Sequence, residues 1–453
     1  MRTKRQHRCE ACGHITTQWL GRCPSCGGWG TLAAEEIAAS SPAAVRSGPP
    51  RVTALREVDA RGDVRLQTGW GELDRVLGGG LVAGSVVLVG GEPGVGKSTL
   101  LLQVAHALAA RGEPTLYVSG EESARQVRLR ADRLGLLDSA LGIVTETDLE
   151  AIEEAVVQAQ PRLAVVDSIQ TTRAPGVDSL PGSVAQVREC TGRLTELSKR
   201  TGTATMLVGH VTKDGTLAGP KVTEHVVDAV LMFEGDRSQA LKVLRATKNR
   251  YGSTNEVGLF DMTDAGLVEV DNPSSLLLDQ RASEVEGTVA CCTLEGSRPL
   301  ILEVQALVAP SPFAAPRRVA TGLDANRLHL LLAVIEQHAG IRVSQQDVYT
   351  NVVSGVRLTE PAADLAVAMA VMSSALLIPL PSDTIVFGEV GLTGEVRAVS
   401  QTDRRLDEAL RLGFGLAVAP RQKTPRERGP AVREIRSIRE AAAWLRDAGR
   451  EAG

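Results

Sequence analysis

A glycine-rich segment that directly follows an apolar run is the strongest constraint on the fold of this chain. The run SVVLVG occupies residues 85–90, and GEPGVGKST at 91–99 fits the template of a phosphate-binding P-loop. Glycines let the backbone turn so that consecutive N–H groups point at phosphates, and a helix that starts there attracts negative charge. An apolar stretch typical of a helix follows at 100–112. The order strand, loop, helix therefore predicts a nucleotide-binding α/β core.

The P-loop template gives its residues specific roles. We expect Lys97 to reach the β- and γ-phosphates of ATP, and the Ser98 hydroxyl to ligate Mg²⁺. A glycine-rich turn that matches by chance is the alternative, and the flanking strand and helix argue against it. The residues expected to line the nucleotide are Gly91, Glu92, Pro93, Gly94, Val95, Gly96, Lys97, Ser98 and Thr99.

Acidic residues at the ends of two other apolar runs would complete a hydrolytic site. Asp167 ends the run LAVVD, where we expect it to hold Mg²⁺ through a water molecule, with a cap on the next turn as the alternative. Glu121 follows the run TLYVS, which is expected to lie beside the P-loop strand. We expect the Glu121 carboxylate to orient the attacking water, and we interpret its neighbour Glu122 as a more solvated alternative.

Composition divides the 453 residues into four parts. Residues 1–32 are rich in Cys and Gly, and residues 33–51 form a Pro- and Ser-rich stretch that we interpret as a flexible linker. Continuous apolar runs alternate with helical stretches over residues 52–272, which predicts a parallel sheet covered by helices on both faces. The pattern breaks near DNPSS, and residues 273–453 are expected to form a further domain.

The N-terminal cysteines have the spacing of a metal site. Cys9 and Cys12, followed by Cys23 and Cys26, form two C-x-x-C pairs within 18 residues. Each pair points two sulfurs at one centre, and four thiolates satisfy tetrahedral Zn²⁺. Gly27 follows the second pair, where a tight turn favours glycine. A redox-active pair is the alternative, and DNA and a protein both stay open as partners of this zinc finger.

The charge and the distribution of cysteines exclude several classes of protein. The formal net charge is −4, so any contact with nucleic acid must come from local basic surfaces. No apolar run approaches the roughly 20 residues of a membrane span. Four of the seven cysteines lie in the first 26 residues, which suits metal binding in a reducing compartment better than a disulfide framework. The sequence therefore predicts a cytoplasmic protein without a membrane partner.

Three further segments carry a family resemblance. TGWGELDRVLGGGLVAGSVVLVGG at 68–91 resembles the opening segment of a RecA-type core, and ATMLVGH at 204–210 resembles its fourth strand, with His210 as the polar sensor. KNRYG at 248–252 resembles the K-N-R-[FY]-G motif of the bacterial RadA (Sms) family. With the four-cysteine finger and a C-terminal part similar to Lon protease, the whole chain resembles this family.

The resemblance implies both a fold and a function. The fold is α/β: a RecA-like P-loop core, with an N-terminal four-cysteine zinc finger and a C-terminal Lon-like α+β domain. The activity is that of a DNA-dependent ATPase and helicase-type motor that drives branch migration in homologous recombination and repair. The implied assembly is a hexameric ring, with ATP, Mg²⁺ and Zn²⁺ as cofactors. The implied partners are single-stranded and branched DNA and a RecA-type recombinase, at the bacterial nucleoid.

In ring ATPases of this kind, a cation of one subunit completes the active site of its neighbour. The resemblance assigns this role to Lys248 and Arg250, which are spaced i, i+2 and would point to one side of a strand. A solvated basic turn is the alternative. The loops at 169–183 and 211–225 are expected to be mobile and to face DNA. Their candidate phosphate contacts are Arg173, Lys213 and Lys221, with a plain solvent loop as the alternative.

The C-terminal part departs from an active Lon peptidase. Where Lon carries its nucleophilic serine, the chain reads Glu360-Pro361-Ala362, and alanine has no nucleophilic atom. Ser373 and Ser374 follow on an apolar helix, where we expect them to be packed. Arginines gather after residue 397, as a mixed-charge surface or a DNA-guiding face. A degenerate ATP-dependent protease and a KaiC-like signalling ATPase are the alternative functions for the whole chain.

Overall fold

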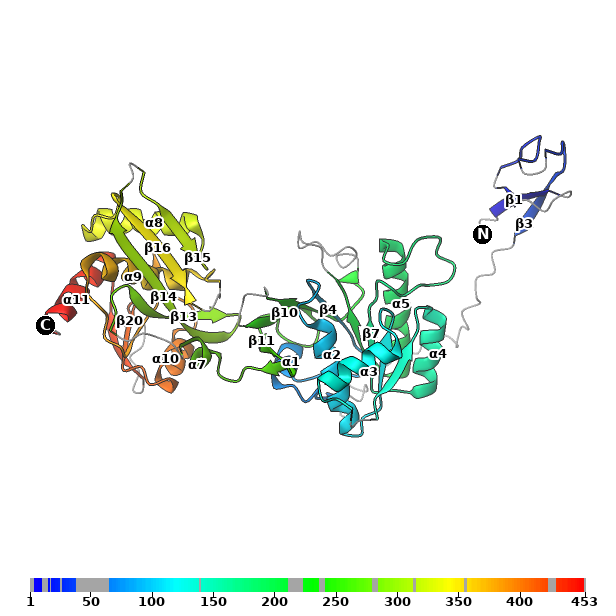
Figure 1. Cartoon of the computed structure of the whole chain (residues 1–453), viewed down its shortest axis with the longest axis horizontal. Coiled ribbons are helices and arrows are strands. Elements are labelled where there is room, and N and C mark those ends of the chain that lie inside the picture. The colour runs from blue at the N-terminus through cyan, green and yellow to red at the C-terminus, as the bar shows by residue number, and fades with distance from the viewer. Residues whose placement is uncertain are drawn as a thin grey trace, which may run out of the picture. The chain divides into compact units, whose positions relative to one another are not determined.

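The structure is a computed structural model that divides into two units, Met1–Gly62 and Asp63–Gly453 (Figure 1). It describes residues 4–9, 15–16, 18–24, 27–37, 65–137, 140–210, 223–235, 241–278, 284–312, 315–353, 357–422 and 429–451.

The first unit contains a three-stranded antiparallel sheet. Its order is β2 (Ile15–Thr16), β1 (Lys4–Cys9), β3 (Leu32–Ile37). Strand β3 pairs with β1 along its whole length, from Cys9 opposite Leu32 to Lys4 opposite Ile37. Residues 33–37 are therefore part of the sheet, and the prediction that the linker begins at residue 33 is wrong. The reason is that the backbone of β1 needs a second partner strand, and residues 32–37 supply it.

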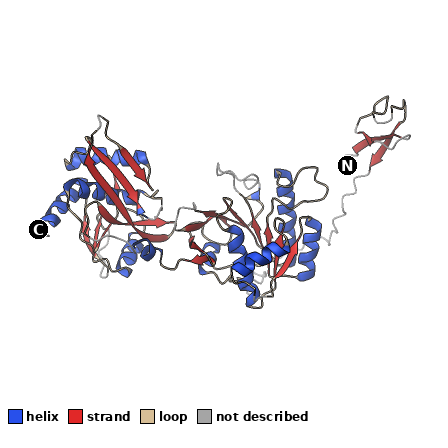
Figure 2. Ribbon diagram, viewed as in Figure 1, coloured by secondary structure: helices blue, strands red, loops and turns tan. Residues whose placement is uncertain are grey.

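The second unit begins with a nine-stranded sheet in the order β12-β11-β10-β9-β4-β8-β7-β5-β6. Figure 2 shows the strands in red and the helices in blue. Its strands in chain order are β4 (Val86–Gly91), β5 (Thr115–Ser119), β6 (Gly142–Thr145), β7 (Leu163–Asp167), β8 (Ala204–Val208), β9 (Ala229–Glu234), β10 (Lys242–Asn249), β11 (Val257–Thr263) and β12 (Gly266–Glu269). Strands β4 to β9 pair with one another in parallel.

Strands β9 to β12 pair antiparallel, so the predicted all-parallel sheet is right only for β4 to β9. The connection from β11 to β12 is only Asp264 and Ala265, which is too short for the crossover that parallel strands need. Apolar runs occur both in the parallel strands and in the antiparallel strands, so the sequence pattern does not distinguish the two kinds of pairing.

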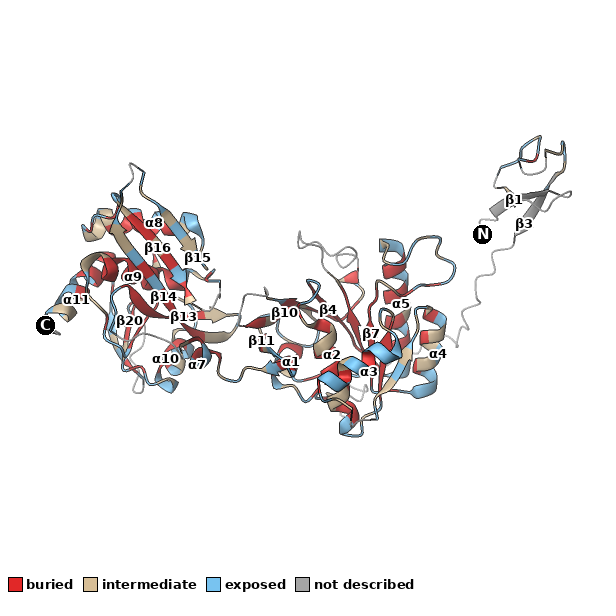
Figure 3. Cartoon of the chain, viewed as in Figure 1, coloured by how far each residue is buried: buried red, intermediate tan, exposed pale blue. Residues whose placement is uncertain are grey.

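Helices cover both faces of this sheet. The face with Val87 and Val89 packs against α1 (Gly71–Leu77), α2 (Lys97–Ala110) and α3 (Ala124–Arg133). The face with Val86 and Leu88 packs against α4 (Leu149–Ala159) and α5 (Val184–Thr201). Every residue of β4 is buried (Figure 3), as expected for a strand that lies between two layers of helices.

The predicted position of the TLYVS strand is wrong. Strand β4 lies between β8 and β9, whereas β5 lies between β7 and β6. Strand β7, which ends at Asp167, is also separated from β4 by β8. The chain leaves β4 through α2 and passes over two positions, which β7 and β8 fill later in the sequence. Order along the chain therefore does not give order in this sheet.

The rest of the unit is built on a seven-stranded mixed sheet in the order β15-β16-β14-β13-β17-β20-β21. The strands are β13 (Thr288–Glu295), β14 (Arg298–Pro310), β15 (Arg318–Thr321), β16 (Gln346–Val352), β17 (Thr384–Val386), β20 (Leu416–Ala419) and β21 (Ala431–Glu434), and β18 (Glu389–Val390) with β19 (Val396–Arg397) forms a separate pair. The helices are α7 (Pro273–Leu278), α8 (Ala325–Val334), α9 (Asp364–Leu376), α10 (Thr402–Arg411) and α11 (Ile438–Glu451).

Helix α9 is the centre of this second core. Its residues from Asp364 to Ser374 are all buried, and it packs against β13 and β14. A helix that is apolar on all sides can be stable in water only when it is enclosed in this way. Within the described residues, no helix is long and apolar enough to cross a membrane.

Candidate active site

The P-loop connects the buried strand β4 to the first turn of α2. Gly94 and Gly96 have φ angles of 83° and 116°, in the region that favours glycine. A Cβ at Gly96 would lie 2.7 Å from Cε of Met262, so a side chain there would also require the end of this methionine to shift. The loop backbone is thus shaped by glycine at the points where the template requires it.

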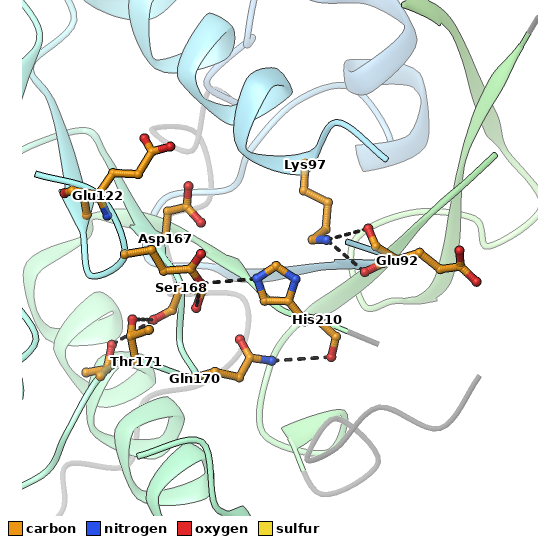
Figure 4. A network of polar contacts seen from close by, with 12 residues as sticks. Glu92, Lys97, Glu122, Asp167, Ser168, Gln170, Thr171 and His210 are labelled. Atoms are coloured by element: carbon orange, nitrogen blue, oxygen red, sulfur yellow. Dashed lines mark hydrogen bonds and ion pairs between the residues drawn. The ribbon is translucent and has the colours of Figure 1, made fainter. Parts of the chain in front are cut away.

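Lys97 is the first residue of α2, and its side chain is buried. Its Nζ atom donates to the carbonyl oxygens of Gly91 at 2.9 Å and Glu92 at 3.0 Å, as Figure 4 shows. Burial lowers the pKa of the Lys97 ammonium, and the carboxylates of Asp167 and Glu121 act in the opposite direction. The two predicted acids are therefore close enough to Lys97 to act on its charge.

Asp167 lies at the carboxyl end of β7 and is 5% exposed. Its Oδ2 atom accepts a hydrogen bond from the Tyr117 hydroxyl at 2.5 Å. Its Oδ1 atom is buried and has no hydrogen-bond partner among the described residues. An unpaired buried carboxylate oxygen is costly, so it suits a site that binds a further group. The Ser98 hydroxyl, in the first turn of α2, likewise bonds to no residue that the structure describes.

Glu121 and Glu122 point to different neighbours. Oε1 of Glu121 accepts from the Ser168 hydroxyl at 2.5 Å and lies 3.3 Å from Nε2 of His210. The Glu122 carboxylate instead lies 3.1 Å from the Arg130 guanidinium. The Glu121 side chain is 41% exposed and that of Glu122 is 35% exposed, so the interpretation of Glu122 as the more solvated acid is wrong. The reason is its ion pair with α3.

Polar side chains from several strands meet at this edge of the sheet. Lys97 follows β4, Glu121 follows β5, Asp167 ends β7 and His210 follows β8. The carboxyl ends of parallel strands share one edge, where α/β proteins bind ligands. Nδ1 of His210 and Oε1 of Gln170 are also buried without a hydrogen-bond partner in the described part of the chain. Figure 4 shows His210 near Ser168, with Gln170 donating to the His210 carbonyl. The donor set fits a nucleotide with Mg²⁺.

The structure does not bring Lys248 and Arg250 to this cluster. Asn249 pairs with Ala229 at the start of β9, and Ala229 pairs with Val87 near the start of β4. The cations therefore lie at the amino edge of the sheet, whereas the P-loop follows the opposite end of β4. Six strand residues at about 3.3 Å each separate the two edges by roughly 15–20 Å.

Both cations contact the segment that precedes β9. Nζ of Lys248 donates to the carbonyl oxygens of Glu224 at 2.5 Å and Val227 at 2.8 Å. Arg250 lies 3.2 Å from Oδ1 of Asp228 and donates to the His225 carbonyl at 3.3 Å. The two side chains thus point to the same side, as their spacing predicts.

Part of the loop at 169–183, which is expected to be mobile, makes contacts with α5. The fully buried Gln186 accepts from the Ala174 amide at 2.8 Å and donates to the carbonyl oxygens of Val177 and Ser179 at 3.0 and 3.1 Å. Arg173 in this loop is exposed, and its backbone is bonded to Thr147 and Leu149. Lys213 and Lys221 lie outside the described residues.

The four cysteines of the predicted zinc finger are described only in part. Cys23 is buried, and its carbonyl accepts from the Gly27 amide at 2.9 Å in a tight turn. Gly27 has a φ angle of 75°, which confirms the predicted role of glycine there. The Cys9 backbone ends β1, while its side chain and all of Cys12 and Cys26 lie outside the described residues. Four thiolates with a turn of this kind fit Zn²⁺.

The peptidase position of the C-terminal part is filled by packing. Ala362 is buried in a short helical turn, Pro361–Ala363. Ser373 accepts from the Gly287 amide and donates to the Ile378 carbonyl, and Ser374 accepts from the Val308 amide. Both serines are therefore packed, as predicted.

Among the described arginines after residue 397, one lies in the core; Arg426 and Arg428 lie outside the described residues. Arg405 is fully buried, pairs with Glu360 and donates to the Cys292 carbonyl. It therefore belongs to the core and is excluded from the predicted basic face. Exposed members include Arg404 and Arg411, and Arg411 pairs with Glu408.

Sequence reasoning missed Tyr117, Arg130 and Ser168, which contact the two site acids. Tyr117 precedes Glu121 by four residues, and Ser168 follows Asp167, so proximity to the motifs was an available signal. Arg130 is one of four arginines in α3, and nothing in the sequence distinguishes it from the others.

Two family models match parts of the chain. Residues 53–216 match the family described as AAA domain, and residues 7–34 match the family described as rubredoxin metal binding domain. Among solved structures, a KaiC-like protein from Pyrococcus horikoshii matches 46% of this chain and 99% of its own at 21% identity, with a TM-score of 0.39.

Curated relatives match almost the whole chain. "DNA repair protein RadA" of Pseudomonas aeruginosa is 51% identical over 94% of this chain and 95% of its own length. The proteins of the same name from Halalkalibacterium halodurans and Bacillus subtilis are 48% and 46% identical over 92% of this chain, covering 92% and 93% of their own lengths. The cofactors are accordingly ATP with Mg²⁺ for the ATPase domain and Zn²⁺ for the ribbon. With its RecA-like ATPase core and N-terminal zinc ribbon, the chain belongs to the DNA repair protein RadA family.

Proposed function

We propose that this chain is a DNA-dependent ATPase, a helicase-type motor that drives branch migration of DNA during homologous recombination and repair. The observation that carries the proposal is the meeting of Lys97, Glu121 and Asp167 beside a glycine-shaped P-loop. The names of the relatives direct the proposal to DNA. Single-stranded and branched DNA would be its substrates and a RecA-type recombinase its partner, at the nucleoid in the cytoplasm.

Each residue of the cluster has a task in this proposal. The N–H groups of the P-loop and the Lys97 ammonium would hold the β- and γ-phosphates of ATP, and Ser98 and Asp167 would hold Mg²⁺. When bound, the metal ion neutralises charge that develops on the transferred phosphate. Glu121 would orient the attacking water, because Ser168 and His210 fix one of its oxygens and its side chain stays open to solvent.

We propose that Lys248 and Arg250 act on the nucleotide of a neighbouring subunit in a hexameric ring. Support comes from their position at the edge of the sheet opposite to the P-loop of their own chain, which they cannot reach. Arg250→Ala should keep nucleotide binding and lose hydrolysis by on the order of 10³-fold. Mixing this variant with Lys97→Ala subunits would create some intact interfaces. If the mixture stays as inactive as its two components, the role across subunits is wrong.

Contact with DNA is proposed for Arg173, Lys213 and Lys221. Cations on loops supply affinity for phosphates without reading sequence, so binding should weaken steeply with added salt. The exposed Arg173 side chain on an anchored loop suits this role. A degenerate protease is disfavoured, because Ala362 is buried and the nearby serines are bonded to backbone groups.

The test is the ATPase rate at low salt with and without single-stranded DNA, together with migration of a synthetic branched junction. We expect DNA to stimulate turnover, and ATP to be required for junction movement. Lys97→Ala serves as the inactive control. Turnover that is indifferent to DNA would reject the motor function, while the ATPase assignment would stand.

A further inference from the structure

The two carboxylate oxygens of Asp167 have different environments. Oδ2 accepts the Tyr117 hydroxyl at 2.5 Å, and Oδ1 is buried with no partner in the described part of the chain. A carboxylate that rotates freely would present either oxygen to a ligand. In this site Oδ2 already accepts the Tyr117 hydroxyl, so only Oδ1 is available to a ligand.

The fold sets up this contact. Strands β5 and β7 are adjacent and parallel, with Tyr117 opposite Val165 and Ser119 opposite Asp167. Residues two apart on a strand share a face, so Tyr117 lies on the face of Asp167, one step earlier along the sheet. The Tyr117 side chain has no exposure to solvent and belongs to the core under α2 and α3. Its hydroxyl therefore has a fixed position.

Arg130 of α3 determines the direction of the Tyr117 hydrogen bond. Its Nη2 atom donates to the Tyr117 oxygen at 3.2 Å and lies 3.9 Å from Oδ2 of Asp167. A guanidinium can only donate, so the phenol oxygen accepts from Arg130 and its own hydrogen is directed to Asp167. Burial, and next the charge of Asp167, raise the pKa of Tyr117 well above its ordinary value, which keeps the phenol protonated.

Arg130 is itself held by Glu122. The Glu122 carboxylate lies 3.1 Å from Nη2 of Arg130, and the Arg130 side chain is only 16% exposed. Serine and backbone contacts hold Glu122 in turn, since its amide donates to the Ser119 hydroxyl at 3.0 Å. The contacts therefore run in one series, from Glu122 to Arg130, from Arg130 to Tyr117, and from Tyr117 to Oδ2 of Asp167. The other carboxylate oxygen of Asp167, Oδ1, stays unpaired.

We propose that Tyr117 and Arg130 are positioning residues that orient the Asp167 carboxylate, so that Oδ1 is left for the water shell of nucleotide-bound Mg²⁺. The inference rests on the proposed role of Asp167 toward Mg²⁺. It gives Glu122 a function as the acid that holds Arg130, distinct from that of Glu121.

The experiment measures how the affinity for a fluorescent, non-hydrolysable ATP analogue depends on the concentration of Mg²⁺. Loss of a group that orients a metal ligand typically weakens metal affinity by 10- to 100-fold. For Tyr117→Phe we expect the half-saturating Mg²⁺ concentration to rise about 10-fold, with the affinity measured in EDTA unchanged. Thr115→Val removes a hydroxyl from the same strand and face without touching Asp167, so it should behave as the unmodified protein.

Arg130→Gln is the second variant, and we expect it to raise the half-saturating Mg²⁺ concentration about 3-fold, since Tyr117 remains. Arg133→Gln, on the exposed side of the same helix, is its matched control. An unchanged Mg²⁺ dependence in both Tyr117→Phe and Arg130→Gln would overturn the inference. An equal loss of affinity with and without metal would also overturn it, because a merely structural defect predicts that result.

Asp167→Asn separates this inference from the proposed function. If Asp167→Asn alters the Mg²⁺ dependence and Tyr117→Phe does not, the positioning role is wrong and the role of Asp167 stands. If Asp167→Asn also leaves the Mg²⁺ dependence unchanged, the proposed metal role of Asp167 fails, and the inference fails with it.

Discussion

The ATPase sheet and the C-terminal domain pair their carboxylates in different ways. At the carboxyl edge of the ATPase sheet, Asp167, Gln170 and His210 each keep a buried atom without a partner among the described residues. In the C-terminal domain the carboxylates of the partly buried Glu360 and the buried Asp364 are paired with arginines and backbone N–H groups. The unpaired buried oxygens described there, on Gln346 and Thr384, belong to uncharged side chains. A site that binds a ligand keeps bonding capacity open, whereas a scaffold uses its capacity internally.

The largest effect is expected for Lys97→Ala, which tests whether the open edge of the ATPase sheet is the hydrolytic site. Lys97→Ala removes the cation that the P-loop places at the phosphates, so we expect ATP turnover to fall on the order of 10³-fold. The measurement is steady-state hydrolysis with saturating DNA. The exposed Lys199→Ala on α5 is the control and should keep its activity. Retention of turnover by Lys97→Ala would show that the open edge is not the hydrolytic site.

Arg405→Met tests whether the pair that Arg405 forms with Glu360 stabilises the C-terminal domain. It leaves the Glu360 carboxylate without its buried partner, which typically costs about 3–5 kcal/mol of the free energy of unfolding. The measurement is urea unfolding, monitored by a probe in the C-terminal domain. The affinity for nucleotide in the folded protein should stay the same.

Adding Glu360→Gln to Arg405→Met should recover part of the lost stability, since the uncompensated charge is then removed. A single variant Arg405→Met that unfolds at the same urea concentration as the unmodified protein would contradict the view of this pair as a structural element.

The smallest expected effects come from replacing one serine in each region, Ser98 and Ser373, with alanine. Ser98→Ala should lower turnover about 10- to 100-fold, because a metal ligand is lost, with little change in stability. Ser373→Ala removes a hydroxyl that bonds Gly287 and Ile378, and should cost about 1–2 kcal/mol of stability with unchanged turnover. The measurements are ATPase rates and urea unfolding on both variants. If Ser98→Ala and Ser373→Ala changed turnover and stability equally, the ATPase edge and the C-terminal domain would not differ in the way proposed.

Local patterns predicted the elements that depend on short spacing. The P-loop could be found because its turn needs glycine at fixed positions and needs a strand and a helix on either side. Gly27 was predictable for the same reason, and Ser373 and Ser374 because they lie in an apolar helix. For the P-loop and Gly27 the determining geometry lies within a few residues, whereas the two serines bond to Gly287 and Val308 and only their location in an apolar helix was local.

Predictions that depended on the order of strands failed. The TLYVS strand does not lie beside β4, and β10 to β12 turn antiparallel. Glu122 was misjudged because its partner Arg130 comes from the next helix. The contacts of Gln186 with the loop at 169–183 were not predicted either. Arg405 was misjudged because its partner Glu360 is 45 residues away. Long-range partners of this kind leave no periodic signal.

The sequence alone determined that the chain has a phosphate site, two cysteine pairs and an alanine at residue 362. These depend on which atoms a residue carries and on spacing along a few residues. The tertiary structure decided which acid faces the open site, which arginine is buried, and that Lys248 and Arg250 lie at the edge opposite to their own P-loop. The physical reason is that strand order and helix packing bring together residues that are distant in sequence, and only their contacts set burial, direction and charge.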